Sequence, residues 1–300
     1  MTRTATRQAG KPDVKRTKTT KTTRPAPKKA ERAAPSKSSA IKTYKAAIAH
    51  LNSLVDYEKM LRLQYNEDRF DLRKMQKLLH GLGNPHKQLK VLHVAGTKGK
   101  GSTCHMLAAM LKKAGHTVGL YTSPHIMDVR ERIRINGEMI SESAFTKYAD
   151  TISKVTLGAD SPTYYEFMTA MAMLCFAEKN LDYVVLETGM GGRLDATNVV
   201  TPVVCGITNI SYDHMAQLGN TLDKIATEKA GIFKPGVTVI SAPQSSAAEK
   251  ALNKVAEKVG CNIRVLGKDV EFSYRFESSR ATGPHTRICM ATAGTRFDHL

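Results

Sequence analysis

The sequence predicts a three-layer α/β/α protein in which a mainly parallel sheet is covered by helices on both faces. Short runs of apolar, often β-branched residues alternate with helical patterns between residues 91 and 266. Such runs are typical of strands that are buried on both faces of a sheet. The first run passes directly into a glycine-rich loop and then a helix, an arrangement that binds phosphate in nucleotide-binding proteins.

Two helical patterns precede the first strand. One covers 41–63, and the other covers 72–82 and ends at Gly83-Asn84-Pro85, where proline cannot continue a helix. Further helices are expected at 104–114, 141–155, 163–178, 221–230 and 246–259. Strands are expected at 91–95, 117–122, 132–135, 182–186, 203–207, 237–241 and 262–266. Beyond Lys268, period-two patterns at 270–276 and 287–292 predict a small β segment.

Much of the net charge of +18 lies at the N-terminus of the 300-residue chain. Residues 1–38 hold twelve Lys or Arg against Asp13 and Glu31, a net charge of +10, with few large apolar residues. We expect this segment to be a disordered basic tail, because it cannot bury enough apolar surface to fold. An organelle transit peptide is the alternative. Residues 39–300 are expected to form the folded domain.

The five cysteines are scattered and lack metal-type spacing, so we expect small core residues in a reducing, cytoplasmic environment. No apolar run approaches the length of a membrane span, and we expect no membrane association.

A phosphate-binding loop is expected between the first strand and the following helix. It consists of Gly96, Thr97, Lys98, Gly99, Lys100, Gly101, Ser102 and Thr103. Backbone N–H groups of such a loop surround a phosphate chain, Lys100 would reach the terminal phosphates, and Ser102 or Thr103 would offer a hydroxyl to Mg²⁺. The spacing is tighter than in the common GxxxxGK[ST] loop, and a simple turn is the alternative.

Polar residues follow several other expected strands and would converge on the same edge of the sheet. Ser123 and Glu187 each end an apolar run, and His214 follows another by a few residues. A carboxylate at the end of an apolar strand needs a cation, and Mg²⁺ prefers oxygen ligands. The alternatives are a salt-bridged or helix-capping Glu187 and an ordinary surface His214. A glycine-rich loop containing Arg193 and Asp195 completes the set.

Five motifs stand in an order that resembles the folylpolyglutamate synthase/dihydrofolate synthase family, a branch of the Mur ligase superfamily. They are His93-Val-Ala-Gly-Thr-Lys-Gly-Lys-Gly-Ser102, Tyr121-Thr-Ser-Pro-His125, Glu187-Thr-Gly-Met-Gly-Gly-Arg-Leu-Asp-Ala-Thr-Asn198, Ile210-Ser-Tyr-Asp-His214 and Glu228-Lys-Ala-Gly-Ile-Phe233. The resemblance covers about residues 41–300. Lys98 stands where many members of the family have asparagine.

The resemblance implies a P-loop-containing, Mur ligase-like central domain and an ATP-dependent ligase. ATP would phosphorylate the carboxylate of dihydropteroate or a folate, and L-glutamate would attack the acyl phosphate. Lys100, His214 and Lys229 are the implied catalytic residues, and Ser102, Ser123, Glu187 and His214 the implied Mg²⁺ ligands. Lys229 would carry a carbamate; an ordinary exposed helix lysine is the alternative. The implied pterin-binding residues are Thr163, Tyr164, Tyr165, Glu166, Leu194, Asp195 and Ala196. One of the two tyrosines would stack on the pterin, unless it packs in the core.

The family also has a C-terminal domain that binds glutamate, and its motifs do not occur in these 300 residues. We therefore expect the chain alone to form amide slowly or not at all. The competing hypotheses are a cell-wall Mur-type ligase and a non-catalytic nucleotide-binding remnant with a nucleic-acid-associated tail. We favour a monomer that binds small molecules and no specific nucleic acid.

Overall fold

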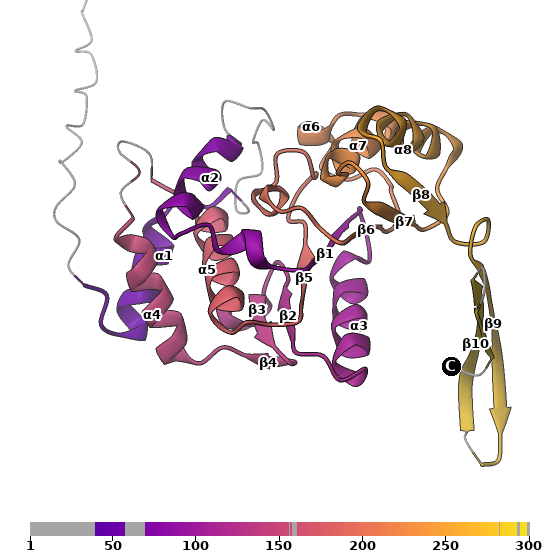
Figure 1. Ribbon diagram of the computed structural model, residues 1–300, viewed down its shortest axis with the longest axis horizontal. Coiled ribbons are helices and arrows are strands. Elements are labelled where there is room, and N and C mark those ends of the chain that lie inside the picture. The colour runs from indigo at the N-terminus through magenta and orange to yellow at the C-terminus, as the bar shows by residue number, and fades with distance from the viewer. Residues whose placement is uncertain are drawn as a thin grey trace, which may run out of the picture. The chain divides into compact units, whose positions relative to one another are not determined.

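The computed structural model describes residues 40–57, 70–155, 157, 161–281, 283–292 and 295–298. The expected tail, 1–38, lies outside these residues. Within them, the chain forms the expected three-layer α/β/α structure (Figure 1). Its main sheet has the strand order β4-β3-β2-β5-β1-β6-β7-β8.

The six strands from β2 to β8 in that order are parallel, and β3 and β4 add an antiparallel edge. Their bounds are β1 Val91–Ala95, β2 Val118–Tyr121, β3 Ile133–Ile135, β4 Glu138–Met139, β5 Tyr183–Glu187, β6 Val204–Ile207, β7 Thr238–Ser241 and β8 Asn262–Val265. The central strand β1 lies between β5 and β6, so the loops that follow these three strands meet at one edge of the sheet.

Helices cover both faces of the sheet. The α-helices are α1 Tyr44–Ser53, α2 Leu72–Gly81, α3 Lys100–Lys113, α4 Glu142–Ser153, α5 Tyr164–Glu178, α6 Met215–Leu218, α7 Leu222–Lys229 and α8 Ser246–Val259. Short 3-10 helices are η2 Pro85–Gln88, η3 Val129–Arg132, η4 Ala196–Val199 and η5 Ala230–Ile232. Helix α3 packs on Val94 and Val185, whereas α5 packs on the opposite face with Val184.

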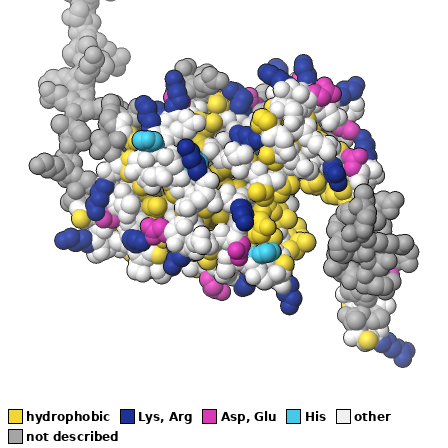
Figure 2. Space-filling view, viewed as in Figure 1, with side chains coloured by type: hydrophobic (Ala, Val, Ile, Leu, Met, Phe, Trp, Pro, Cys, Tyr) yellow, Lys and Arg dark blue, Asp and Glu magenta, His cyan; other side chains and the backbone are white. Residues whose placement is uncertain are grey.

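Helix α5 is the most buried helix of the described chain, and most of its side chains are inaccessible to solvent. Helix α3 is less covered, and Met106 and Met110 are exposed one turn apart. Figure 2 shows the resulting apolar surface over α3, with basic and acidic side chains scattered over the rest of that face. A separate antiparallel sheet is formed by β9 Glu271–Ser279, β10 Gly283–Thr292 and β11 Thr295–Asp298, which confirms the expected β segment.

Most expected elements are confirmed, with ends that shift by one to four residues. The helix expected over 41–63 is wrong after Ser53, where Leu54 turns to extended backbone; its last part, from residue 58, lies outside the described residues. The carbonyl of Val55 then accepts a hydrogen bond from Tyr164 N at the start of α5, so a tertiary contact ends the helix. The structure also adds β4, α6 and β11, which the periodicity did not predict because they are short.

Candidate active site

The expected phosphate loop connects β1 to the N-terminus of α3, and the helix begins at Lys100 rather than at Cys104. Gly99 is the N-cap residue with φ of 84°, a conformation that favours glycine. At Gly96 a Cβ atom would lie only 1.8 Å from Thr208 Oγ1. Glycine at position 96 therefore lets the loop lie close to the end of strand β6. Glycine at position 99 lets the helix N-terminus face an anion.

The phosphate loop is bonded to the loop that follows β6. Thr97 N donates to Asn209 O at 2.8 Å, and the Thr97 hydroxyl both donates to Ser211 O and accepts from Ser211 N, each at 3.1 Å. Lys98 Nζ lies 3.1 Å from Asp213 Oδ2. These contacts place His214, the next residue, beside the phosphate loop.

Glu187 ends β5 with its side chain 5% exposed, and its carboxylate accepts from Ser123 N at 3.1 Å. Burial raises the pKa of Glu187, whereas the Ser123 N–H and the positive charge of Lys100 act in the opposite direction. A Cβ atom on Gly101 would lie 3.3 Å from Glu187 Oε2, so the glycine leaves room for the carboxylate. A buried carboxylate of this kind fits a cation site.

A cavity of about 370 Å³ opens at this edge of the sheet. Three of the expected catalytic or metal-binding residues line it: Lys100, Ser123 and His214. Its other walls include the expected pterin-binding residues Thr163, Tyr165, Glu166, Leu194, Asp195 and Ala196. Residues that are far apart in sequence and were selected by separate motifs thus surround one space large enough for a small heterocycle.

The two neighbouring tyrosines have different environments. Tyr164 is 4% exposed and packs under the guanidinium of Arg132, 5.3 Å from the ring centre, so it belongs to the core. Tyr165 lines the cavity, with its hydroxyl 3.4 Å from Asp195 Oδ1. Thr163 and Glu166 bond reciprocally as the capping box of α5, which orients this wall of the cavity.

Asp195 is buried and holds the glycine-rich loop in place. Its carboxylate accepts from Met190 N at 2.9 Å and from Thr197 N at 3.0 Å, and burial raises its pKa. Beneath it, the hydroxyl of Thr197 lies 2.8 Å from His93 Nε2. Burial lowers the pKa of His93 to about 3, so the ring is neutral. Asp195 is therefore suited to positioning the loop as well as to touching a ligand.

Lys229 is buried, 3% exposed, which contradicts the alternative of an exposed helix lysine. Its Nζ donates to the carbonyl of Gly96 at 2.6 Å. Burial, followed by the nearby charge of Lys100, lowers the pKa of Lys229 to about 7. A substantial neutral fraction at physiological pH is what an amine needs to react with CO₂.

Two close contacts between the glycine-rich loop and the end of α7 fix Lys229. Arg193 N donates to Glu228 O at 2.9 Å, and the Arg193 guanidinium pairs with the Glu228 carboxylate at 3.1 Å. A Cβ on Gly192 would lie 2.7 Å from the Lys229 carbonyl oxygen, and one on Gly231 would lie 2.3 Å from Arg193 Cα. Both glycines are required by this backbone approach.

Ser102, an expected Mg²⁺ ligand, is not among the residues that line the cavity. It lies in the first turn of α3 and is exposed. Within the described residues, no group of three or more His, Cys, Asp and Glu side chains is arranged to hold a metal. The expected Mg²⁺ set has only Glu187 and His214 of those types, and serine hydroxyls complete it with hard oxygen atoms that suit this ion.

The cavity also has walls that the sequence patterns did not indicate. Tyr57 and Phe70 line it, with ring centres 5.4 Å apart, and so do Met190 and Gln217. Tyr57 fell inside the expected helix over 41–63, and no spacing pattern marks it as a site residue. Tyr57 reaches the same cavity as the glycine-rich loop through the tertiary fold, which local sequence patterns do not show.

No helix in the described part of the chain is long and apolar enough to cross a membrane. The thiols of Cys104, Cys175 and Cys205 are free and buried, as expected for core cysteines, whereas that of Cys261 is free and half-buried.

Comparisons with known proteins agree with this geometry. The model of the Mur ligase middle domain matches residues 94–283. Folylpolyglutamate synthase from Arabidopsis thaliana is 41% identical over 230 residues, covering 75% of this chain and 40% of that protein. Dihydrofolate synthase/folylpolyglutamate synthase from Bacillus subtilis (strain 168) is 44% identical over 193 residues, covering 62% of this chain and 45% of that protein.

Solved structures show the same fold. An FPGS–AMPPCP–folate complex superimposes with a TM-score of 0.76 at 31% identity, covering 86% of this chain and 62% of the other. The chain spans less than half the length of the two curated relatives. Because the family model covers most of the sequence and includes the phosphate loop, Glu187 and Lys229, the chain belongs to the Mur ligase family.

Proposed function

We propose that this chain is the ATP-binding, carboxylate-activating part of a ligase that adds L-glutamate to dihydropteroate or a folate. The observation that carries the proposal is the shared cavity, in which Lys100, Ser123 and His214 face Tyr165 and the glycine-rich loop. The similarity to folylpolyglutamate synthases, one of them solved with AMPPCP and folate, supports the same assignment.

In this proposal the loop from Gly96 to Thr103 binds ATP. The N-terminus of α3 and the backbone N–H groups of the loop stabilise the phosphate oxygens, and Lys100 neutralises the charge of the terminal phosphates. Lys100 lies with its Nζ 3.5 Å from Thr97 O, folded over the loop, so a phosphate chain would meet a cation already in place.

Mg²⁺ would be held by Ser102, Ser123, Glu187 and His214. The donor set fits because it combines hydroxyl and carboxylate oxygens with one imidazole, and because Glu187 is buried beside the loop that would hold the phosphates. Bound there, the ion would neutralise charge on the β- and γ-phosphates.

The acceptor would lie with its flat ring in the cavity beside Tyr165 and its carboxylate toward Lys100. Thr163, Glu166, Leu194, Asp195 and Ala196 would form the surrounding wall, and Tyr164 would support it from the core. An aromatic ring suits a pterin because it offers a flat apolar face and, through the tyrosine hydroxyl, a polar edge.

The chemistry needs positioning and charge neutralisation more than a protein nucleophile. A carboxylate oxygen of the acceptor attacks the γ-phosphorus, and the bond to the bridging oxygen of ADP breaks. The amine of L-glutamate then attacks the acyl carbon, an amide bond forms, phosphate leaves, and the proton of the amine passes to water. The chain's own residues hold the two reacting groups at the same edge of the sheet.

Lys229 would act as a carbamate. Its neutral amine attacks the carbon of CO₂, a C–N bond forms, and one proton leaves to water. The product converts a cation into an anion beside Gly96 and the phosphate loop, where it could orient a second cation. The buried position and the pKa of about 7 support this proposal.

The family features on which this proposal depends lie within residues 91–231, whereas the relatives are more than twice as long as the matched part. We further propose a cytoplasmic monomer that recognises small molecules rather than nucleic acid. The free thiols support the reducing compartment, and the relative solved with AMPPCP and folate supports the small-molecule ligands.

The test is mass spectrometry of the amide product with ATP, L-glutamate and either dihydropteroate or tetrahydrofolate. It compares the chain alone with a fusion to the remaining C-terminal part of the Bacillus subtilis relative. The fusion should form glutamylated product, and Lys100→Ala should abolish it, whereas Lys113→Ala, at an exposed position on the same helix, should not. Absence of product from the fusion with both acceptors, or turnover of a UDP-muramoyl acceptor instead, would contradict the proposal.

A further inference from the structure

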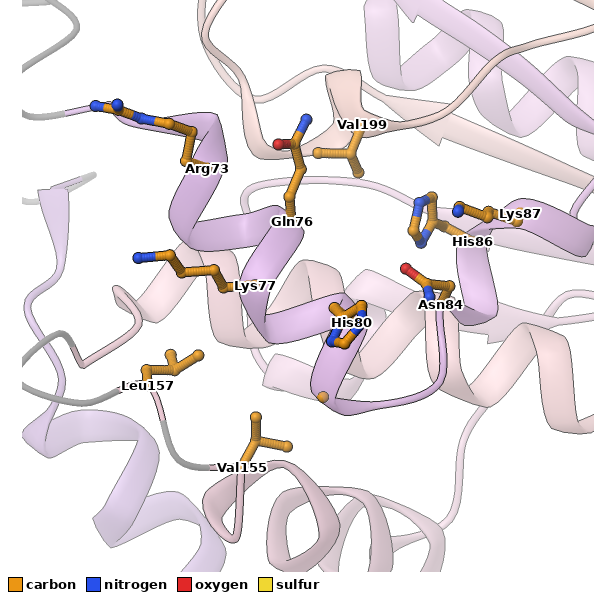
Figure 3. Close-up of a pocket in the computed structure, with 11 residues that line it drawn as sticks. Arg73, Gln76, Lys77, His80, Asn84, His86, Lys87, Val155, Leu157 and Val199 are labelled. Atoms are coloured by element: carbon orange, nitrogen blue, oxygen red, sulfur yellow. The ribbon is translucent and has the colours of Figure 1, made fainter.

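A second and larger cavity, of about 840 Å³, lies along the outer side of α2 (Figure 3). It is lined by residues of α2, of η2 and of the turn between them, together with Val155, Leu157 and Val199. None of the residues that line it carries a carboxylate, whereas two lysines, one arginine and two histidines do line it. We call it the α2 cavity.

Its basic groups are available to a ligand. Lys77 and Lys87 are exposed, and neither has an ion-pair partner among the described residues. Arg73 lines the cavity too, but it pairs with Asp71 at 2.9 Å. The Nδ1 atom of His86 is buried and has no hydrogen-bond partner in the described part of the chain. The cavity therefore presents the positive charge of Lys77 and Lys87, with no carboxylate among the residues that line it.

These groups are spread over the cavity and do not meet at one point. Figure 3 shows Arg73 and Lys77 directed to one side of α2, and Gln76, Asn84 and His86 around the hollow on the other side. A single phosphate group is held by donors that converge on it. A distributed set of cations and amides suits a flexible ligand that carries a negative charge at regular intervals.

The α2 cavity adjoins the candidate active site through two shared elements. Asp71 and Leu72, at the start of α2, line the active-site cavity, whereas Lys77 and His80 further along the helix line the α2 cavity. At the two ends of η4, Ala196 lines the active-site cavity and Val199 lines the α2 cavity. A chain that extends out of the active site past these elements would therefore reach the basic groups.

We propose that the α2 cavity binds the γ-linked oligoglutamate chain of a folate that has already been extended. Each glutamate joined through its γ-carboxyl group leaves one free α-carboxylate, so the chain is a flexible polyanion with evenly spaced charges. It has to leave the active site if its terminal carboxylate is to return to the phosphate loop for another cycle. This inference rests on the proposed function and deepens it.

The experiment is isothermal titration calorimetry of the 300-residue chain with free γ-linked pentaglutamate, without pterin or nucleotide, at low ionic strength. Lys77→Gln combined with Lys87→Gln should weaken binding by about two- to thirtyfold, since each exposed ion pair contributes about 0.2–1 kcal/mol. The matched control is Lys254→Gln combined with Lys258→Gln, two exposed lysines of α8 that do not line the cavity, and it should bind as the parent does.

Equal weakening in both double variants, or no binding by the parent, overturns the inference. The inference is also overturned if tripolyphosphate or a short RNA binds through the α2 cavity lysines while pentaglutamate does not bind. Failure of the proposed function is visible separately, because pentaglutamate binding requires neither ATP nor turnover. If the fusion glutamylates its acceptor but the parent does not bind pentaglutamate, the proposed ligase function stands and the proposed role of the α2 cavity is excluded.

Discussion

The side-chain nitrogen of Lys229 lies 2.6 Å from the carbonyl oxygen of Gly96, the first residue of the phosphate loop. The two residues are 133 positions apart in the sequence. The contact joins the end of α7 to the loop that is proposed to bind ATP, and it keeps the amine out of water. Its chemistry is therefore set by the fold around it.

Stability should depend on pH through Lys229. The pKa of its amine is about 7 in the folded protein, whereas the ordinary value is 10.5. Between these values the unfolded chain binds a proton that the folded chain does not, so the free energy of unfolding rises with pH by up to about 1.4 kcal/mol per unit. Below pH 7 the amine is charged in both states, and the fold bears the full cost of the buried charge.

Urea denaturation of the parent and of Lys229→Met at pH 7, 8 and 9, in CO₂-free buffer, measures this effect. The difference in unfolding free energy between the two proteins should move in favour of the parent as pH rises. Parallel pH profiles would mean that Lys229 is not the group responsible.

The carbamate itself should be visible in solution. In buffer containing ¹³C-bicarbonate near pH 8, we expect a carbamate ¹³C resonance from the parent, because the amine of Lys229 is then mostly neutral. Lys229→Met should lack it, and the exposed-lysine variant Lys113→Met should keep it. A resonance that survives in Lys229→Met would assign the modification to another amine.

Lys100→Ala should weaken MgATP binding by roughly ten- to a hundredfold, in line with the loss of a charged hydrogen bond worth about 1.5–3 kcal/mol. The melting temperature should hardly change, since Lys100 supplies charge at a loop and fills no core volume. Calorimetric titration with MgATP gives the affinity. If Lys100→Ala bound MgATP with unchanged affinity, the assignment of the phosphate loop to the nucleotide site would be wrong.

Glu187→Gln and His214→Ala should each raise the Mg²⁺ concentration needed for half-maximal nucleotide binding, and should affect metal-free ATP binding less. Both follow from their positions beside Ser123 and the phosphate loop. Glu249→Gln, on α8, serves as a control that removes one acidic charge elsewhere. If Mg²⁺ titrations of the two site variants coincide with that of the parent, neither residue is a ligand.

Gly231→Ala should destabilise the fold by about 1–3 kcal/mol, because the new methyl group would collide with Arg193 Cα. Gly206→Ala adds a methyl group at ordinary contact distance, 3.4 Å from Val94 Cγ2, and should have a smaller effect. Chemical denaturation of both variants makes the comparison. Equal stability would show that α7 and the glycine-rich loop can separate without cost.

The alternation of apolar runs and helical patterns predicted the sheet because burial on both faces leaves few polar positions in a strand. It could not predict the end of α1, which depends on the hydrogen bond between Val55 and Tyr164. Of the site, the motif residues were predictable, and the structure places nine of them around one cavity. Their binding roles remain predictions.

The burial of Lys229 was not predictable from its charged helical surroundings. It depends on the close backbone approach at Gly192 and Gly231, which joins segments far apart in sequence. Tyr57 and Phe70 were missed for a related reason, because an aromatic side chain near a cavity has the same local pattern as one in a core.

The paired hydrogen bonds between Thr97 and Ser211 have a thermodynamic consequence. They join the segment that would receive the nucleotide to the one that carries His214, so ordering of either segment reduces the conformational entropy that the other still has to lose. Nucleotide and cation should therefore show positive heterotropic linkage. By reciprocity, the factor by which ATP raises the affinity for the ion equals the factor by which the ion raises the affinity for ATP.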